Sequence, residues 1–410
     1  MYYLDQTNSK QHSYPTYGRQ FAAYRWYKPI ITAFVFAVVY LALYLAGIIL
    51  VSAACGAAVG ADGARELLSG ALADNYDDMD VSNTLQNIMS FGSLAIMIPS
   101  LWIASLIVRD RPFSSYSSSR GGWNHKVFWK CMPVAFLCIG IPIIVDEVVI
   151  NGGWNDFQMK FTLASLITLT LLCPLQCIAE EYIFRGLMMQ TLGSWVRIPV
   201  IAVIVQALIF AAAHPYNNIG KIAIVASGMT FAMTAWLGRG IEVSSAFHIC
   251  NNMTIFYLMG LNMTTVETNV TMDSLYVDIG TGIAYIAVIF ILSRKTNWFD
   301  EVRKDDLEKA NTKYNEKKAL KAAKKAAKAA GKGISAAGTA AGSAAAGAVD
   351  RVVDFTAGNA DQEQTGSEMT SAAETSSAEE ASRAADAYSG YQGRSGRSDR
   401  DRTEGKHFKK

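Results

Sequence analysis

Eight stretches of the chain are continuously apolar over a length that suits a membrane span. Each supplies about 18 to 25 mostly hydrophobic residues, which is what an α-helix needs to cross the hydrocarbon core of a bilayer. The stretches centre on Ala42, Met97, Phe136, Thr168, Val205, Ser227, Ile249 and Ala287. This pattern predicts an all-α polytopic membrane protein, with a bundle of about eight transmembrane helices over residues 30–296.

The loops between these stretches differ in charge. Lys and Arg gather before the first stretch and after the second, fourth, sixth and eighth, whereas Asp and Glu dominate the other loops. Cytoplasmic loops carry the excess of Lys and Arg, so both termini are predicted to be cytoplasmic, in a multi-pass protein of the cell membrane. Residues 1–29 then form a short cytoplasmic segment, and the first stretch, which is too long for a signal-peptide core, is expected to be retained.

The apolar pattern stops at about residue 297. Residues 297–334 predict a basic cytoplasmic helix, in which six lysines recur at steps of three and four on one face: Lys317, Lys318, Lys321, Lys324, Lys325 and Lys328. This stripe over residues 317–328 suits anionic membrane lipid, and a solvated helix without a partner is the alternative. No nucleic acid is expected as a partner, because no aromatic residues lie among the lysines. Residues 335–410 have too little apolar surface to fold, so a low-complexity, mostly disordered tail is predicted.

The fourth stretch places ionisable side chains in an apolar setting, at Glu180, Glu181 and Arg185. An Asp, Lys or Arg at the centre of a membrane helix costs about 2.5 to 3.5 kcal/mol, and such groups usually pair or face a water-filled cavity. Glu181 and Arg185 are four residues apart and can form an ion pair, whereas Glu180 points elsewhere and is expected to have no local partner. A network that only stabilises the bundle is the structural alternative.

Two later stretches carry histidines. Phe210 precedes His214 by four residues near the end of the fifth stretch, and His248 and Asn252 share one face of the seventh. Counted from the turns, both groups lie at a depth comparable with that of Glu180, provided that the fourth helix continues past its arginine. A glutamate, two histidines and an amide on three helices are therefore expected to meet near mid-bilayer.

Three motifs in this order resemble the signatures of a known family: Glu180-Glu181-x-x-x-Arg185, Phe210-x-x-x-His214 and His248-x-x-x-Asn252. The family is CPBP, also called Abi, which includes the type II CAAX prenyl endopeptidases and bacterial bacteriocin-processing and immunity proteins. The resemblance covers residues 160–260 in detail and the eight-span layout more loosely. It implies an intramembrane endopeptidase that hydrolyses a peptide bond in a hydrated cavity, with a peptide or protein substrate such as a prenylated protein or a leader peptide.

The resemblance also implies roles for individual residues. Glu180 becomes the general base that activates water, and His214 helps to hold that water. His248 and Asn252 face the oxyanion of the tetrahedral intermediate. Three further residues are expected to support the site: Glu181, Arg185 and Phe210, the last by packing behind His214.

The resemblance leaves metal dependence open. Two histidines and a glutamate are a common ligand set for catalytic zinc, which makes Glu180, His214 and His248 the candidate ligands. The sequence contains no HExxH pair, however, and the two histidines stand on different helices. The favoured mechanism therefore requires no cofactor, with zinc as the alternative.

Two rival functions fit the same residues. A non-catalytic membrane immunity or scaffold protein would keep the signature without cleaving a substrate. A proton-coupled transporter would use the intramembrane Glu, His and Arg as a relay. The transporter is less favoured, because the two halves of the sequence show no inverted repeat.

Overall fold

The computed structural model describes residues 13–71, 79–265, 268–301 and 306–336, and the regular structure in these ranges is helical. Within them, one isolated antiparallel β-bridge joins Ser118 to Gly240. The chain divides into two compact units, Met1–Leu320 and Lys321–Lys410. The first unit holds every predicted membrane segment, and the prediction of an all-α protein is confirmed for the described residues.

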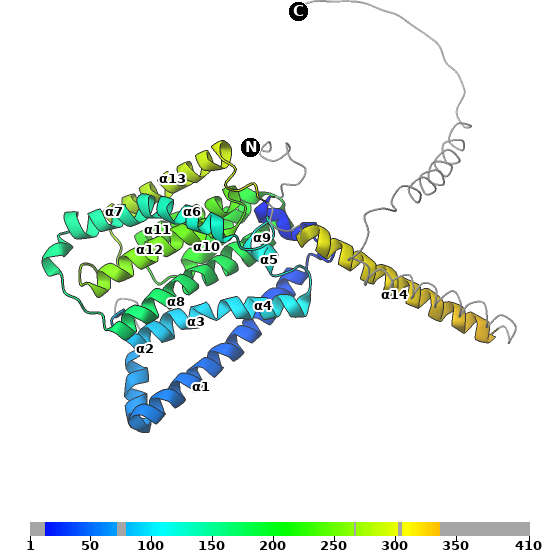
Figure 1. Cartoon of the computed structure of the whole chain (residues 1–410), viewed down its shortest axis with the longest axis horizontal. Helices are drawn as coiled ribbons and strands as arrows, with labels where there is room; N and C mark the ends of the chain where they lie inside the picture. The colour runs from blue at the N-terminus through cyan, green and yellow to red at the C-terminus, as the bar shows by residue number, and fades with distance from the viewer. Residues whose placement is uncertain (1–12, 72–78, 266–267, 302–305, 337–410) are drawn as a thin grey trace, which may run out of the picture. The chain divides into compact units, whose positions relative to one another are not determined.

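Each of the eight predicted stretches is helical (Figure 1). The first is α1 (Lys28–Ala71), and the second runs through α2 (Thr84–Asn87), η3 (Ile88–Gly92), α3 (Ser93–Ala95) and α4 (Met97–Val108). The third comprises α6 (His125–Ala135), η4 (Phe136–Gly140), α7 (Ile141–Ile144) and η5 (Val145–Ile150), and the fourth α8 (Leu163–Glu181), η7 (Tyr182–Met189) and α9 (Gln190–Val196). The remaining four are α10 (Pro199–Ala212), α11 (Asn218–Leu237), α12 (Ile241–Gly260) and α13 (Met272–Lys295).

Among the described residues, six of these segments are long and apolar enough to cross a membrane, which is fewer than the eight predicted. The chain is a multi-pass membrane protein on this basis. The two exceptions are α10, which has only 14 residues, and α12, which is long enough but rich in polar residues. Glu242, Ser244, Ser245 and His248 of α12 are all buried in protein, so this helix is surrounded by other helices rather than by lipid.

The fourth segment carries most of the candidate site and is one continuous helical rod. It begins at a capping box, in which Thr162 and Ser165 satisfy each other's backbone N–H groups. The rod then passes through the π-helical segment η7 and ends where Arg197 adopts a left-handed conformation with φ of 64°. The expected continuation of this helix past Arg185 is therefore confirmed.

The segments pack around α12, which contacts α6, α8 and α11. Every residue of α12 from Ile241 to Cys250 is buried. By contrast, α1 is largely exposed, packs against α4, and changes direction at Gly60, whose φ is 78°. The arrangement leaves α1 as an outer helix and brings the polar motif of α12 against the polar motif of α8.

The N-terminal segment, predicted to be a simple cytoplasmic extension, contributes to the core. Its 3₁₀-helix η1 (Tyr14–Gln20) packs against α9, and Tyr14, Tyr17 and Phe21 are buried. The Tyr14 hydroxyl donates to the backbone carbonyl of Tyr116, and burial raises the pKa of Tyr14 well above its usual value. The tyrosine therefore remains a hydrogen-bond donor at any physiological pH.

The predicted basic helix is α14 (Asp306–Ala336), which begins later than the expected start near residue 297. The six lysines of its stripe are exposed on this helix. Asn311 near its start accepts from the backbone N–H of Ala22 at 2.6 Å, within the first compact unit. The predicted tail from residue 337 onward lies outside the described residues, and the boundaries assigned to the four segments of the chain stay predictions.

Candidate active site

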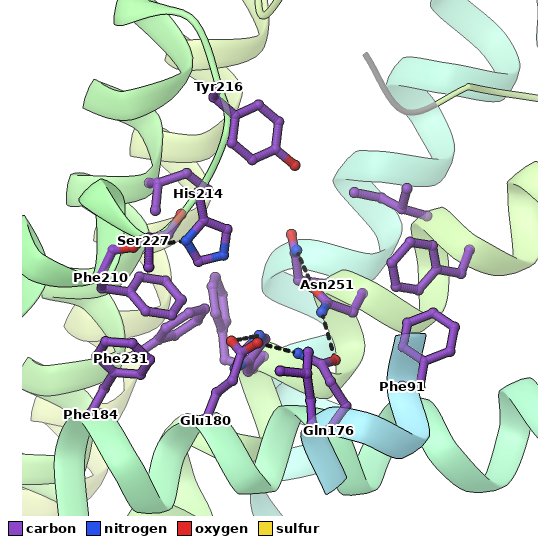
Figure 2. Close-up of a pocket in the computed structure, with 18 of the residues that line it drawn as sticks. Phe91, Gln176, Glu180, Phe184, Phe210, His214, Tyr216, Ser227, Phe231 and Asn251 are labelled. Carbon is purple, nitrogen blue, oxygen red and sulfur yellow. Dashed lines mark hydrogen bonds and ion pairs between the residues drawn. The ribbon is translucent and has the colours of Figure 1, made fainter. Parts of the chain in front are cut away.

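A cavity of about 600 Å³ lies among the helices and is lined by the predicted site residues. Glu180 enters it from α8, and His214 enters it from the residues just after α10 (Figure 2). His248 and Asn252 line it from α12. Phe210 lines the same cavity. The expected convergence of these groups is thus present in the structure, while their catalytic roles stay predictions.

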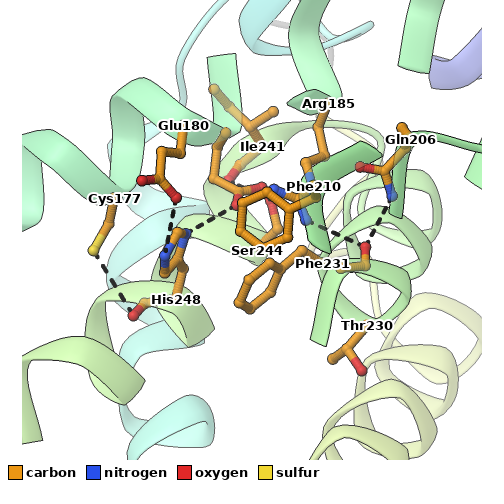
Figure 3. Close-up of polar contacts among 12 residues, drawn as sticks. Cys177, Glu180, Arg185, Gln206, Phe210, Thr230, Phe231, Ile241, Ser244 and His248 are labelled. Carbon is orange, nitrogen blue, oxygen red and sulfur yellow. Dashed lines mark hydrogen bonds and ion pairs between the residues drawn. The ribbon is translucent and has the colours of Figure 1, made fainter. Parts of the chain in front are cut away.

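Glu181 and Arg185 form a fully buried ion pair behind the cavity, as the four-residue spacing predicted. The distance between Arg185 NH1 and Glu181 Oε1 is 3.0 Å, and neither side chain is exposed. The Ser244 hydroxyl donates to Glu181 Oε2 at 2.6 Å, and His248 Nδ1 lies 3.1 Å from Glu181 Oε1. Figure 3 shows that the His248 ring is also directed toward Glu180. Three neighbours therefore compensate the charge of one buried carboxylate.

Glu180 has a different environment from its neighbour in sequence. Gln176, one turn earlier on α8, donates from Nε2 to Glu180 Oε1 at 2.6 Å. The expectation that Glu180 lacks a local partner is therefore wrong, because an amide four residues away lies on the same helix face. The other oxygen, Oε2, is 3.7 Å from His248 Nε2, which is too long for a hydrogen bond. That oxygen is available to water in the cavity.

The contacts of His248 determine which of its nitrogens carries a proton. Its Nδ1 faces Glu181, which as an ionised carboxylate can only accept, so Nδ1 carries the hydrogen. The imidazole also stacks on Phe231, with ring centroids 4.6 Å apart and an interplanar angle of 16°. In the neutral ring, Nε2 therefore presents a lone pair toward Glu180, and it becomes a donor only when the ring is protonated.

His214 is oriented by a backbone group at the end of α10. Its Nδ1 lies 2.7 Å from the carbonyl oxygen of Phe210, so Nδ1 donates and Nε2 of the neutral ring is an acceptor. The ring packs against Phe210 at a centroid distance of 4.6 Å, which confirms the expected contact between them. Tyr216 stacks near the other side of the ring at 6.2 Å. His214 can therefore accept a hydrogen bond from water in the cavity.

Several polar residues of the site were missed in the sequence. The Gln176 carbonyl accepts from Asn252 Nδ2 at 3.4 Å, and Asn251, which also lines the cavity, donates to Asn252 Oδ1 at 3.0 Å. Gln206 donates to the Gly228 carbonyl at 2.9 Å. Gln176 and Gln206 could have been found from the sequence, because each is an amide side chain within an otherwise apolar stretch.

Arg185 has further partners besides the Glu181 carboxylate. Its NH2 donates to the Gly228 carbonyl at 3.2 Å, and its guanidinium lies 4.6 and 4.8 Å from the ring centroids of Phe210 and Phe231. These rings stabilise the cation and separate it from the cavity. Arg185 lies within η7, and π-helical turns of this kind are frequent at functional sites because they change the direction of side chains.

The candidate zinc ligands do not form a metal site. In the described part of the chain, no group of three or more His, Cys, Asp or Glu side chains is arranged to hold a metal ion. Glu180, His214 and His248 line one cavity, but they do not make up such a group. The expectation that the reaction requires no cofactor stays a prediction.

The fold and the cavity define a multi-pass membrane protein with an acid, two imidazoles and amides around an internal polar site. Residues 162–254, which run from the start of α8 into α12, match the family described as type II CAAX prenyl endopeptidase Rce1-like. The chain thus contains a domain of this family, CPBP, as the three motifs predicted. The members of this family are described as endopeptidases.

The chain is also similar to a curated bacterial protein, the uncharacterized protein YyaK of Bacillus subtilis (strain 168). The two are 25% identical over 170 residues, which is 38% of this chain and 55% of YyaK. The chain therefore spans about half the length of the curated relative it matches. No solved structure gives a significant match.

Proposed function

We propose that the protein is an intramembrane endopeptidase that hydrolyses a peptide bond with water activated by Glu180. The observation that carries the proposal is the free oxygen of Glu180, which faces the cavity shared with both histidines. Glu180 is 8% exposed, so it is sheltered from lipid yet accessible to the cavity. A carboxylate in such a place can act as a general base, because its free oxygen can accept a proton from water in the cavity.

The reaction begins with water hydrogen-bonded between Glu180 and His214. Glu180 takes one proton of the water while the resulting hydroxide forms a bond to the carbonyl carbon of the peptide. His214 accepts a hydrogen bond through Nε2 from the O–H group that the hydroxide keeps, and so orients the attack. The C–N bond then breaks, and the proton held by Glu180 goes to the departing amine.

Two residues of α12 stabilise the oxyanion. Asn252 supplies an amide donor, and His248 donates from Nε2 in its imidazolium form, whose extra proton comes from water in the cavity before the attack and stays on the ring. Glu181 stabilises that imidazolium through Nδ1, in the manner of a carboxylate behind a catalytic histidine. A single donor to an oxyanion typically contributes about 2.7 to 4 kcal/mol to the barrier.

Comparative proteomics of membranes tests the proposal. Cells with the wild-type chain, with Glu180→Gln and with Glu66→Gln are compared by mass spectrometry of membrane-derived peptides. Glu66 is exposed on α1, so Glu66→Gln is a control that makes the same chemical change at a position outside the cavity. We expect Glu180→Gln alone to accumulate uncleaved substrates, with prenylated proteins and leader peptides as the first classes to inspect. A full biological effect of Glu180→Gln, with unchanged peptides, would instead support the non-catalytic scaffold.

A further inference from the structure

A second carboxylate enters the cavity from α13. Asp278 lines the cavity together with Thr281, whereas Glu180 enters from α8. Thr281, Tyr285 and Ile289 are buried, and they follow Asp278 by three, seven and eleven residues. These spacings put all four residues on one face of the helix. Asp278 therefore faces protein and cavity rather than lipid.

Close packing fixes the position of this face. A Cβ atom on Gly282 would lie 2.5 Å from Thr230 Oγ1, so α13 approaches α11 as closely as a glycine allows. The Tyr285 hydroxyl donates to the Val243 carbonyl of α12 at 2.8 Å. Because α13 is held against both helices, the separation between Asp278 and the catalytic end of the cavity is set by the fold.

The described lining of the cavity contains two acids but no Lys or Arg to pair with them. These acids are Glu180 and Asp278. Thr281 bonds to the backbone carbonyl of Asp278 at 3.1 Å, and no ion pair of the described residues includes the Asp278 carboxylate. An unpaired carboxylate inside a membrane protein is costly, and such groups usually serve a ligand or an ion.

The walls of the cavity add to its attraction for a cation. Aromatic rings line it on several sides, including Phe91, Phe210, Tyr216, Phe231 and Phe256. The faces of such rings attract ammonium and guanidinium groups. The volume of about 600 Å³ is sufficient for several side chains of a peptide.

We propose that Asp278 binds a basic side chain of the peptide substrate and thereby selects which peptide bond reaches Glu180. This inference rests on the proposed endopeptidase function. The fixed separation of the two carboxylates leads to a specific consequence: Lys or Arg will occur at one constant position relative to the scissile bond.

The test uses the full chain in lipid nanodiscs and a library of N-acetylated peptides that carry Lys, Arg, Gln or Glu at each position. Cleavage products are identified by mass spectrometry for the wild type and for Asp278→Asn. Asp273→Asn is the matched control, because Asp273 is an exposed acid in the first turn of the same helix and does not line the cavity. We expect the ratio of kcat/KM for Lys over Gln peptides to fall about 10- to 100-fold in Asp278→Asn only. Asp278→Lys should reverse the preference toward Glu.

Two results would overturn the inference: a wild type without positional preference for basic residues, or the same preference in Asp278→Asn. Failure of the proposed function is distinguishable, because the wild type would then cleave no more than Glu180→Gln. In that case, recognition by Asp278 is tested by binding alone. The affinities of fluorescent Lys and Gln peptides are measured for Glu180→Gln and for the double variant Glu180→Gln/Asp278→Asn. Loss of Lys-peptide binding supports recognition by Asp278, and equal binding of both peptides refutes it.

Discussion

The buried pair of Glu181 and Arg185 offers the sharpest test of the site's energetics. Arg185→Met removes the guanidinium and keeps a long apolar side chain between the rings of Phe210 and Phe231. The variant leaves the Glu181 carboxylate with Ser244 and His248 but without a cationic partner, at a position with no exposed side-chain surface. Removing one partner of a buried ion pair typically costs about 3 to 5 kcal/mol. Arg185→Met should therefore lower the free energy of unfolding by about that amount.

The double variant Arg185→Met/Glu181→Gln separates the effect of the unpaired charge from the effect of altered packing. Glu181→Gln removes the negative charge but keeps an oxygen that can accept from His248 Nδ1. If the unpaired charge causes the loss, adding Glu181→Gln to Arg185→Met should restore about 2 kcal/mol or more. The double-mutant cycle comprises the wild type, the two single variants and the double variant. Their unfolding in mixed detergent micelles is followed by tryptophan fluorescence and circular dichroism. A stability of Arg185→Met within about 1 kcal/mol of the wild type, or a double variant no more stable than Arg185→Met, would refute this account of the pair.

Three further predictions concern other parts of the chain. Glu242→Gln should destabilise the protein by about 3 kcal/mol in the same unfolding assay, because it breaks the fully buried 2.8 Å pair with Arg120. Gly186→Val should cost about 1 to 3 kcal/mol or prevent folding, since a Cβ there lies 2.9 Å from the Tyr116 carbonyl oxygen; unchanged thermal unfolding would contradict this. A synthetic peptide of residues 306–336 should bind vesicles that contain phosphatidylserine by about 1 kcal/mol per surface lysine, and should lose that affinity in high salt. Equal binding to zwitterionic vesicles would remove the electrostatic explanation.

Local rules explain which parts of the site were predictable. Glu181 and Arg185 are four apart on one helix, so their pairing follows from helical geometry alone. The order of the three motifs indicated the family. Residue counts from the turns predicted similar depths for Glu180 and the two histidines, and these residues do line one cavity. The partners that come from other helices, such as Ser244 for Glu181, depend on packing that a single sequence does not encode.

The number of spans was predicted less well for a related reason. Apolar composition identifies a helix that avoids water, but lipid and protein interior are equally apolar environments for such a helix. The polar α12 is enclosed by neighbours and carries Glu242 and His248 because other helices compensate them, whereas α10 is short and keeps an exposed apolar face that includes Ile204 and Leu208. Sequence reasoning also overlooked Asp278, whose significance depends on which face of α13 meets the cavity.

Adjacent carboxylates with opposite environments are the physical basis of the proposed mechanism. Successive residues of a helix point about 100° apart, so Glu181 turns into the protein while Glu180 turns toward the cavity. Glu181 is fully buried and bonded to Arg185, Ser244 and His248, and it stays charged to hold the imidazole. Glu180 keeps one oxygen free for water. Neutralising Glu180 should therefore abolish hydrolysis with little loss of stability, whereas neutralising Glu181 should lower both, because only the second change leaves Arg185 as an unpaired buried cation.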